Sequence, residues 1–135
     1  MKVLKLFSII LLASFSHNNL YSQNCSQLKN GTYKIEYDRS FKGYKKYIYE
    51  FINDTCYITG DTGREKFQIT RSSNCTFRLK SEKPLDESNM TDFQKIISKQ
   101  KPFYDIYKVD KNMYWFVLRV DLHVQECSGK FILLE

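Results

Sequence analysis

Apolar and polar residues alternate in short segments along most of the chain. Between Tyr33 and Asp38, for example, aromatic or aliphatic residues occupy every second position and charged residues lie between them. Because successive side chains of a β-strand point to opposite sides of the sheet, this pattern predicts strands with one buried face. Turn-forming residues at 53–54, 60–63 and 110–112 separate several segments, and 125–129 interrupts the last apolar stretch. The segments that we expect to be strands are 33–38, 47–52, 56–59, 66–70, 75–80, 103–109, 114–124 and 131–134.

One segment has helical periodicity. Thr91 and Gln94 fit a capping box, in which each side chain accepts a hydrogen bond from the backbone N–H of the other residue. Three apolar residues between Phe93 and Ile97 share one face at i, i+3 and i+4 spacing, and Pro102 ends the helix. We therefore expect one short helix whose apolar face covers an edge of the core or the mouth of a barrel.

About eight short strands with closely spaced turn signals indicate a mainly β protein, either an antiparallel barrel or a sandwich. An outer-membrane barrel is excluded, because its strands run about 9–11 residues and carry an apolar lipid-facing side. The segments of this chain are mostly shorter and have lysines between their apolar positions.

The N-terminus has the features of a secretory signal peptide. A basic start with Lys2 and Lys5 precedes an apolar run of about ten residues, and small polar residues follow up to Ser22. Two cleavage positions fit this pattern, after Ser16 and after Ser22. We expect the second, which makes residues 1–22 the signal peptide and residues 23–135 a single domain. The apolar run is too short for a transmembrane helix of roughly 20 residues. The sequence therefore predicts a secreted or periplasmic protein without a membrane span.

The four cysteines, Cys25, Cys56, Cys75 and Cys127, are well separated in the sequence. No pair has Cys-x-x-Cys spacing and no histidine cluster accompanies them, so zinc and thioredoxin-like sites are disfavoured. In an oxidising compartment the four cysteines can form two disulfides, with three possible connectivities. Each bridge contributes about 2–4 kcal/mol by restricting the unfolded chain.

The chain is basic but has no continuous charged stripe. Loss of Lys2 and Lys5 with the signal peptide lowers the formal net charge from +6 to +4, and short clusters remain at Lys45-Lys46 and Lys99 to Lys101. Scattered lysines favour a solvated surface over a polyanion-binding patch, and we expect no nucleic-acid partner. Five Asn-x-Ser/Thr triplets mark either glycosylation sites or turns, at Asn24, Asn30, Asn53, Asn74 and Asn89.

Residues suited to catalysis are sparse. His123 is the only histidine after residue 22, and Asp121 lies on the same face of the expected strand. A histidine base needs a nucleophile and an orienting acid that converge in space, and Cys127 is expected in a disulfide. The sequence contains none of the common nucleotide-binding, zinc-protease or serine-hydrolase motifs. It therefore predicts a protein that is not an enzyme and has no catalytic residues, no metal and no cofactor.

Two stretches carry a resemblance to a known group of proteins. Residues 25–33 place a cysteine before Leu-Lys-x-Gly and an aromatic residue, and residues 69–79 contain a cysteine followed by alternating apolar residues. With these motifs the chain resembles the small exported lipocalin-like (calycin-type) β-barrel proteins of Bacteroidetes. The Gly31-x-Tyr33 motif is also similar to the Gly-x-Trp start of lipocalins, with tyrosine in place of tryptophan. The resemblance implies a small antiparallel up-and-down barrel with one short helix. It also implies a Cys25–Cys75 disulfide, which leaves Cys56 to pair with Cys127.

We expect such a barrel to bind an apolar or amphipathic small molecule without catalysis. An interior formed by eight strands is either filled by side chains or holds one small ligand. The chain contains ten Tyr and ten Phe, and rings on inward faces can fill a core or line a cavity. Two alternatives remain open. The first is an envelope or extracellular protein-interaction module with a filled barrel, which contacts its partner through Trp115 and the lysine clusters. The second is an OB-like binder of an oligosaccharide or polyanion. The residues expected to line a ligand cavity are Tyr33, Tyr37, Phe77 and Phe116.

Overall fold

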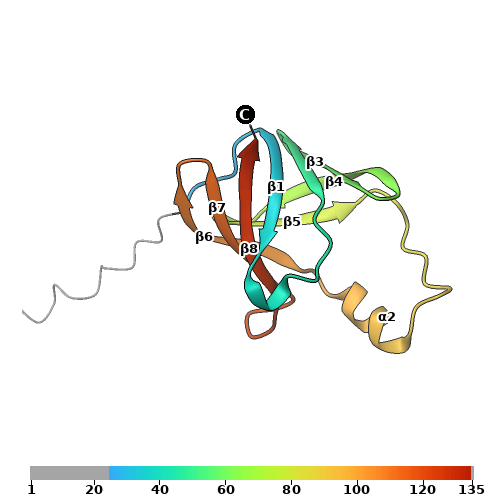
Figure 1. The fold of residues 1–135 in the computed structure, drawn as a ribbon. Helices are drawn as coiled ribbons and strands as arrows, with labels where there is room; N and C mark the ends of the chain where they lie inside the picture. The colour runs from blue at the N-terminus through green and yellow to red at the C-terminus, as the bar shows by residue number, and fades with distance from the viewer. Residues whose placement is uncertain (1–24, 135) are drawn as a thin grey trace, which may run out of the picture.

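Eight antiparallel strands form one closed barrel in the computed structural model (Figure 1), which describes residues 25–134 and all of their side chains except that of Ile97. Each strand pairs with the next in sequence, and the last pairs with the first. The predicted mainly β, up-and-down barrel with one short helix is therefore confirmed. The expected signal peptide, residues 1–22, and Asn24 lie outside the described residues. The strands are β1 (Gly31–Tyr37), β2 (Ile48–Ile52), β3 (Thr55–Gly60), β4 (Gly63–Arg71), β5 (Thr76–Ser81), β6 (Phe103–Asp110), β7 (Met113–Arg119) and β8 (Gln125–Leu134).

The two ends of the barrel differ in their connections. The hairpin end carries the turns 53–54, 72–75 and 111–112, which join β2 to β3, β4 to β5 and β6 to β7. The loop end carries the long connections 38–47, 82–102 and 120–124 together with the short turn 61–62. A 3-10 helix, η1 (Arg39–Phe41), lies in the first of these connections, and α2 (Asp92–Lys99) lies in the second. Figure 1 shows α2 standing to one side of the barrel.

The predicted two-residue turn at Asn53-Asp54 is present between β2 and β3. Asn53 has a φ of 53°, a left-handed conformation that asparagine adopts more readily than most residues. The Asn30 side chain holds it in place, because its Oδ1 accepts the Asn53 backbone N–H at 2.8 Å and its Nδ2 donates to Asn53 Oδ1 at 3.1 Å. This contact connects the start of β1 to the β2–β3 turn across the hairpin end.

The expected boundary between the last two strands is wrong. Alternation of apolar residues continues to Val124, but β7 ends at Arg119. The carboxylate of Asp121 accepts the backbone N–H groups of His123 (2.7 Å) and Val124 (2.8 Å), a local turn that competes with strand pairing. His123 and Asp121 therefore belong to an exposed loop, and the segment expected to be an interruption, 125–129, is the start of β8.

Gly129 explains why this glycine-containing segment is a strand. Its backbone approaches β1 so closely that an added Cβ would lie 2.9 Å from the Tyr37 Cα and collide with the Glu36 carbonyl oxygen. A glycine within a strand pattern thus marks a close approach of two backbones here, and not the end of pairing.

The capping box of α2 is present as predicted. The Thr91 N–H donates to Gln94 Oε1 at 2.9 Å, and the Gln94 N–H donates to Thr91 Oγ1 at 3.2 Å. The expectation that the apolar face covers the core or the mouth is wrong for Phe93 and Ile96, which are 71% and 58% exposed. Among the helices of residues 25–134, none has both the length and the apolar character needed to cross a bilayer.

Candidate functional site

The residues expected to line a ligand cavity mostly fill the barrel instead. Tyr33 and Phe116 are fully buried and Phe77 is 3% exposed. All three pack against Phe131, with ring centroids 6.2, 4.7 and 6.5 Å from its centroid. Aromatic pairs at such separations gain about 0.5–1.5 kcal/mol beyond the burial of their area. These side chains build an aromatic core centred on Phe131.

Tyr37, the fourth expected lining residue, is half-buried beside Phe116 and Tyr44. Its hydroxyl belongs to a group of phenols inside the barrel that also includes Tyr49 and Tyr104. Burial raises the pKa of Tyr49 to about 12, although hydrogen bonding with the Tyr104 and Tyr37 hydroxyls lowers it in part. Burial likewise raises the pKa of Tyr104 well above its ordinary value. These phenols are neutral near pH 7, so they can donate and accept hydrogen bonds but supply no charge.

A cavity of about 250 Å³ opens where β2, β3 and β4 reach the loop end. We call it the mouth cavity. Its apolar wall is formed by Tyr47, Tyr49, Ile58 and Phe67. None of the four residues expected from the sequence lines the mouth cavity, and none lines the open groove along the β5–β6 junction.

Two glycines make room for the mouth cavity. A Cβ on Gly60 would lie 2.6 Å from the Tyr47 ring, so the ring rests on the bare backbone of β3. Gly63, which begins β4, has a φ of +121° and no atom within 4 Å of the position that a Cβ would take. The backbone conformation of Gly63 is one that favours glycine, and among the residues of the β3–β4 turn Thr62 lines the opening.

The polar rim of the mouth cavity contains both signs of charge. Glu65 lines the cavity, and its Oε1 accepts a hydrogen bond from Ser81 Oγ at 2.7 Å. Arg64 also borders the opening, but its guanidinium is paired with Glu50 and lies 3.9 Å from the centroid of the Tyr57 ring.

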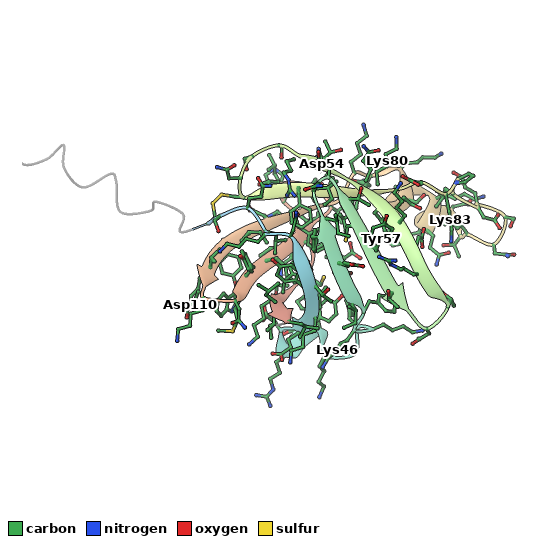
Figure 2. The ribbon with its side chains drawn as sticks, turned by 90° about the horizontal axis from the view of Figure 1, so that it is seen from above. Lys46, Asp54, Tyr57, Lys80, Lys83 and Asp110 are labelled. Carbon is green, nitrogen blue, oxygen red and sulfur yellow. A yellow bond between two sulfur atoms is a disulfide. The ribbon has the colours of Figure 1, made fainter. Side chains whose placement is uncertain are left out.

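Lys83 supplies the remaining positive charge of the rim. It is the second residue of the β5–β6 connection, on the side of the barrel where that connection leaves (Figure 2), and its backbone N–H donates to Ser81 Oγ at 3.1 Å. No acidic side chain within residues 25–134 lies in ion-pair distance of its ammonium group. The rim thus offers one cation, Lys83, without an ion-pair partner, and one carboxylate, Glu65, whose hydrogen bond from Ser81 leaves its charge in place.

The cysteines follow the expected pairing in one case only. Cys25 and Cys75 form a disulfide, as predicted, and it ties the segment before β1 to the start of β5. The second predicted disulfide is wrong: Cys56 on β3 and Cys127 on β8 are free thiols buried in the interior. Two strands, β1 and β2, separate β8 from β3 around the barrel wall. Burial raises the pKa of each thiol to about 12, so both resemble small apolar side chains.

The other residues singled out in the sequence lie on the outer surface. Trp115 is half-buried on the outer face of β7, with the Lys108 ammonium 4.4 Å and the Lys130 ammonium 6.0 Å from a ring centroid. Lys45 pairs with Asp61 at 2.8 Å. Within residues 25–134, no three His, Cys, Asp or Glu side chains come together in a way that could hold a metal ion.

Sequence reasoning missed the mouth cavity for a physical reason. The cavity depends on which ring lies over Gly60 and on the inward direction of Glu65, and both follow from contacts between strands. The available signal was the pair of glycines at 60 and 63 beside alternating aromatic residues, which we interpreted as a turn only. Comparisons with protein-family models, with curated proteins and with solved structures give no match.

Proposed function

We propose that the protein binds a small amphipathic molecule in the mouth cavity. The single observation that carries the proposal is a recess with an apolar wall and a polar rim, on which the Lys83 ammonium group has no ion-pair partner among residues 25–134. An apolar chain would contact Ile58 and Phe67, and an anionic end group would meet the ammonium. The Tyr47 and Tyr49 rings would cover the chain, and their hydroxyls can hydrogen-bond to a polar end group.

The volume of the cavity sets the size of the molecule. A space of 250 Å³ holds about eight water molecules at their liquid volume of roughly 30 Å³ each. This favours a short chain or one ring over a long lipid. Each methylene that moves from water onto the apolar wall contributes about 0.8 kcal/mol, which is about a fourfold change in Kd.

The experiment uses three probes that share an octyl chain: octanoate, octanol and octylamine. We expect octanoate to bind most tightly and octylamine most weakly in isothermal titration calorimetry at pH 7. Lys83→Glu should remove the preference for octanoate, whereas Lys80→Glu, the same charge change at an exposed position outside the cavity, should preserve it. Equal affinities for the three probes, unchanged by Lys83→Glu, would contradict the role of the ammonium.

A second pair of variants tests the cavity itself. Ile58→Trp fills the recess with a larger side chain, and Ile52→Trp makes the same change at a residue on β2 that is 43% exposed. We expect Ile58→Trp to abolish octanoate binding and Ile52→Trp to leave it intact. If both variants bind octanoate like the parent protein, the chain does not enter the mouth cavity and the proposal fails.

A further inference from the structure

The barrel wall has its weakest junction between β5 and β6. Only two residue pairs join these strands, Thr76 with Asp105 and Phe77 with Tyr104, whereas every other pair of neighbouring strands has four or more. Beyond this short junction the chain departs into the connection 82–102 and returns at Phe103. The outer side of the junction is flanked by the end of that connection and by the loop 120–124.

An open groove of about 780 Å³ lies along this junction. We call it the seam groove. It is separate from the mouth cavity, with which it shares no lining residue. The residues that matter for its chemistry are Arg78, Lys99, Lys101, Phe103, Val120 and Leu122.

Three positively charged side chains of the seam groove have no ion-pair partner among residues 25–134. The Arg78 guanidinium lies 5.5 Å from the centroid of the Phe103 ring, and its Nε donates to the Lys101 carbonyl at 3.0 Å, which fixes the side chain along the groove. Within residues 25–134, no carboxylate lies in ion-pair distance of Lys99 or Lys101. Three cations are therefore available to a ligand.

The two carboxylates of the groove are already occupied. Asp105 pairs with Arg119 at 3.7 Å and accepts a hydrogen bond from Thr76 Oγ1 at 3.4 Å. Asp121 accepts two backbone N–H groups of its own loop, which lowers its pKa. Arg119 offsets the charge of Asp105, but Asp121 stays ionised and offsets one of the three cations. The groove therefore keeps a net charge of +3 − 1 = +2, and its electrostatic potential favours an anionic ligand.

An apolar surface accompanies these charges. The Arg78 guanidinium lies over the Phe103 ring, and Leu122, which also lines the groove, is 79% exposed. A purely polyanionic ligand would leave Leu122 and Val120 in water. A ligand that carries both carboxylates and an apolar side chain would use both features.

We propose that the seam groove binds an acidic peptide segment of another protein, with carboxylates against Arg78, Lys99 and Lys101. An apolar side chain of the same peptide packs between Phe103 and Leu122. This inference is independent of the mouth cavity and assigns the Lys99 to Lys101 cluster a role in protein recognition. Binding weakens as salt is added, because the charges are near the surface.

The test uses fluorescein-labelled dodecapeptides and fluorescence anisotropy. In the first peptide glutamate and leucine alternate; in the second serine replaces leucine; in the third lysine replaces glutamate. We expect the Glu–Leu peptide to bind about tenfold or more tightly than either of the others, since each loses one of the two contacts. Equal binding of the Glu–Leu and Glu–Ser peptides would show a general polyanion site and overturn the proposal.

Matched variants locate the site. The double variant Lys99→Glu/Lys101→Glu should weaken binding of the Glu–Leu peptide about tenfold or more. The control double variant Lys45→Glu/Lys46→Glu makes the same change in net charge outside the groove and should have little effect. Equal losses in the two lysine pairs would mean that net charge alone attracts the peptide, and the proposal would fail.

The apolar contact is tested in the same way. Leu122→Ser should also weaken binding of the Glu–Leu peptide, and Leu85→Ser, at a residue that is 52% exposed outside the groove, should not. Octanoate titration of every variant shows whether the mouth cavity remains intact.

Discussion

The ring of Tyr47 occupies the space that a Cβ atom would take on Gly60, with the nearest ring carbon 2.6 Å from that position. The contact joins the end of the 38–47 connection to the last residue of β3. It holds one aromatic wall of the mouth cavity in place without any hydrogen bond. The glycine is therefore required by packing at this position.

Gly60→Ala should displace the Tyr47 ring. Because the added methyl group overlaps the ring, we expect the free energy of unfolding to fall by about 1–3 kcal/mol and octanoate binding to weaken. Urea denaturation and calorimetry measure the two effects. Gly43→Ala is the control, since no atom lies within 4 Å of a Cβ at that position. Stability and affinity equal to those of the parent protein would show that the ring moves aside freely.

Phe131→Ala should be among the most damaging substitutions in the barrel. The ring is fully buried and contacts aromatic rings from five other strands, including Phe51 at 5.8 Å and Tyr104 at 5.5 Å. Truncation of a buried phenylalanine costs about 3–5 kcal/mol. Phe93→Ala, at a residue on α2 that is 71% exposed, should change the free energy of unfolding by less than about 0.5 kcal/mol. Similar losses in the two variants would contradict the position of the core.

Thiol counting tests the cysteine assignment. With Ellman's reagent at pH 8, the folded protein should react slowly, because Cys56 and Cys127 are buried. In denaturant without a reductant we expect two reactive thiols, and after reduction of the Cys25–Cys75 bridge we expect four. No reactive thiol in denaturant would instead indicate a second disulfide between Cys56 and Cys127.

The buried thiols also predict how stability changes with pH. Burial raises the pKa of Cys56 in the folded protein to about 12, against an ordinary value of 9.0. The contribution of the neutral thiol to the free energy of unfolding is therefore fully present below pH 9 and is lost as the pH rises from 9 towards 12. At pH 10 the loss is roughly 1 kcal/mol for this thiol. Cys56→Ala should therefore lose less stability than the parent protein between pH 8 and pH 10. Parallel curves for the two proteins in urea denaturation would contradict this linkage.

Alternation in the sequence was sufficient to predict about eight strands in a barrel or a sandwich, because strand faces and short turns are local properties. The choice of the barrel came from the resemblance to lipocalin-like proteins. The alternation placed Tyr33, Phe77 and Phe116 correctly on inward faces. It did not show that their rings meet at Phe131, since that depends on how strands far apart in the sequence close the barrel. The end of β7 was missed because Asp121 turns the chain while the apolar alternation continues.

The candidate sites were harder to predict than the fold. The mouth cavity depends on the absence of side chains at Gly60 and Gly63 and on the Tyr47 ring, which comes from the 38–47 connection and covers Gly60. The seam groove depends on the short overlap of β5 with β6, which the sequence does not encode as a pattern. The lysine cluster at 99–101 was visible in the sequence, but its neighbours Phe103 and Leu122 come together only in the fold.

The most direct test of the central claim is an intermolecular nuclear Overhauser experiment with octanoate and isotope-labelled protein. If the mouth cavity is the binding site, the octanoate chain will show cross-peaks to the Ile58 methyl groups and to the Phe67 and Tyr47 rings. Cross-peaks to the exposed Leu122 or Phe93 without any to Ile58 would place the chain elsewhere and contradict the proposed function.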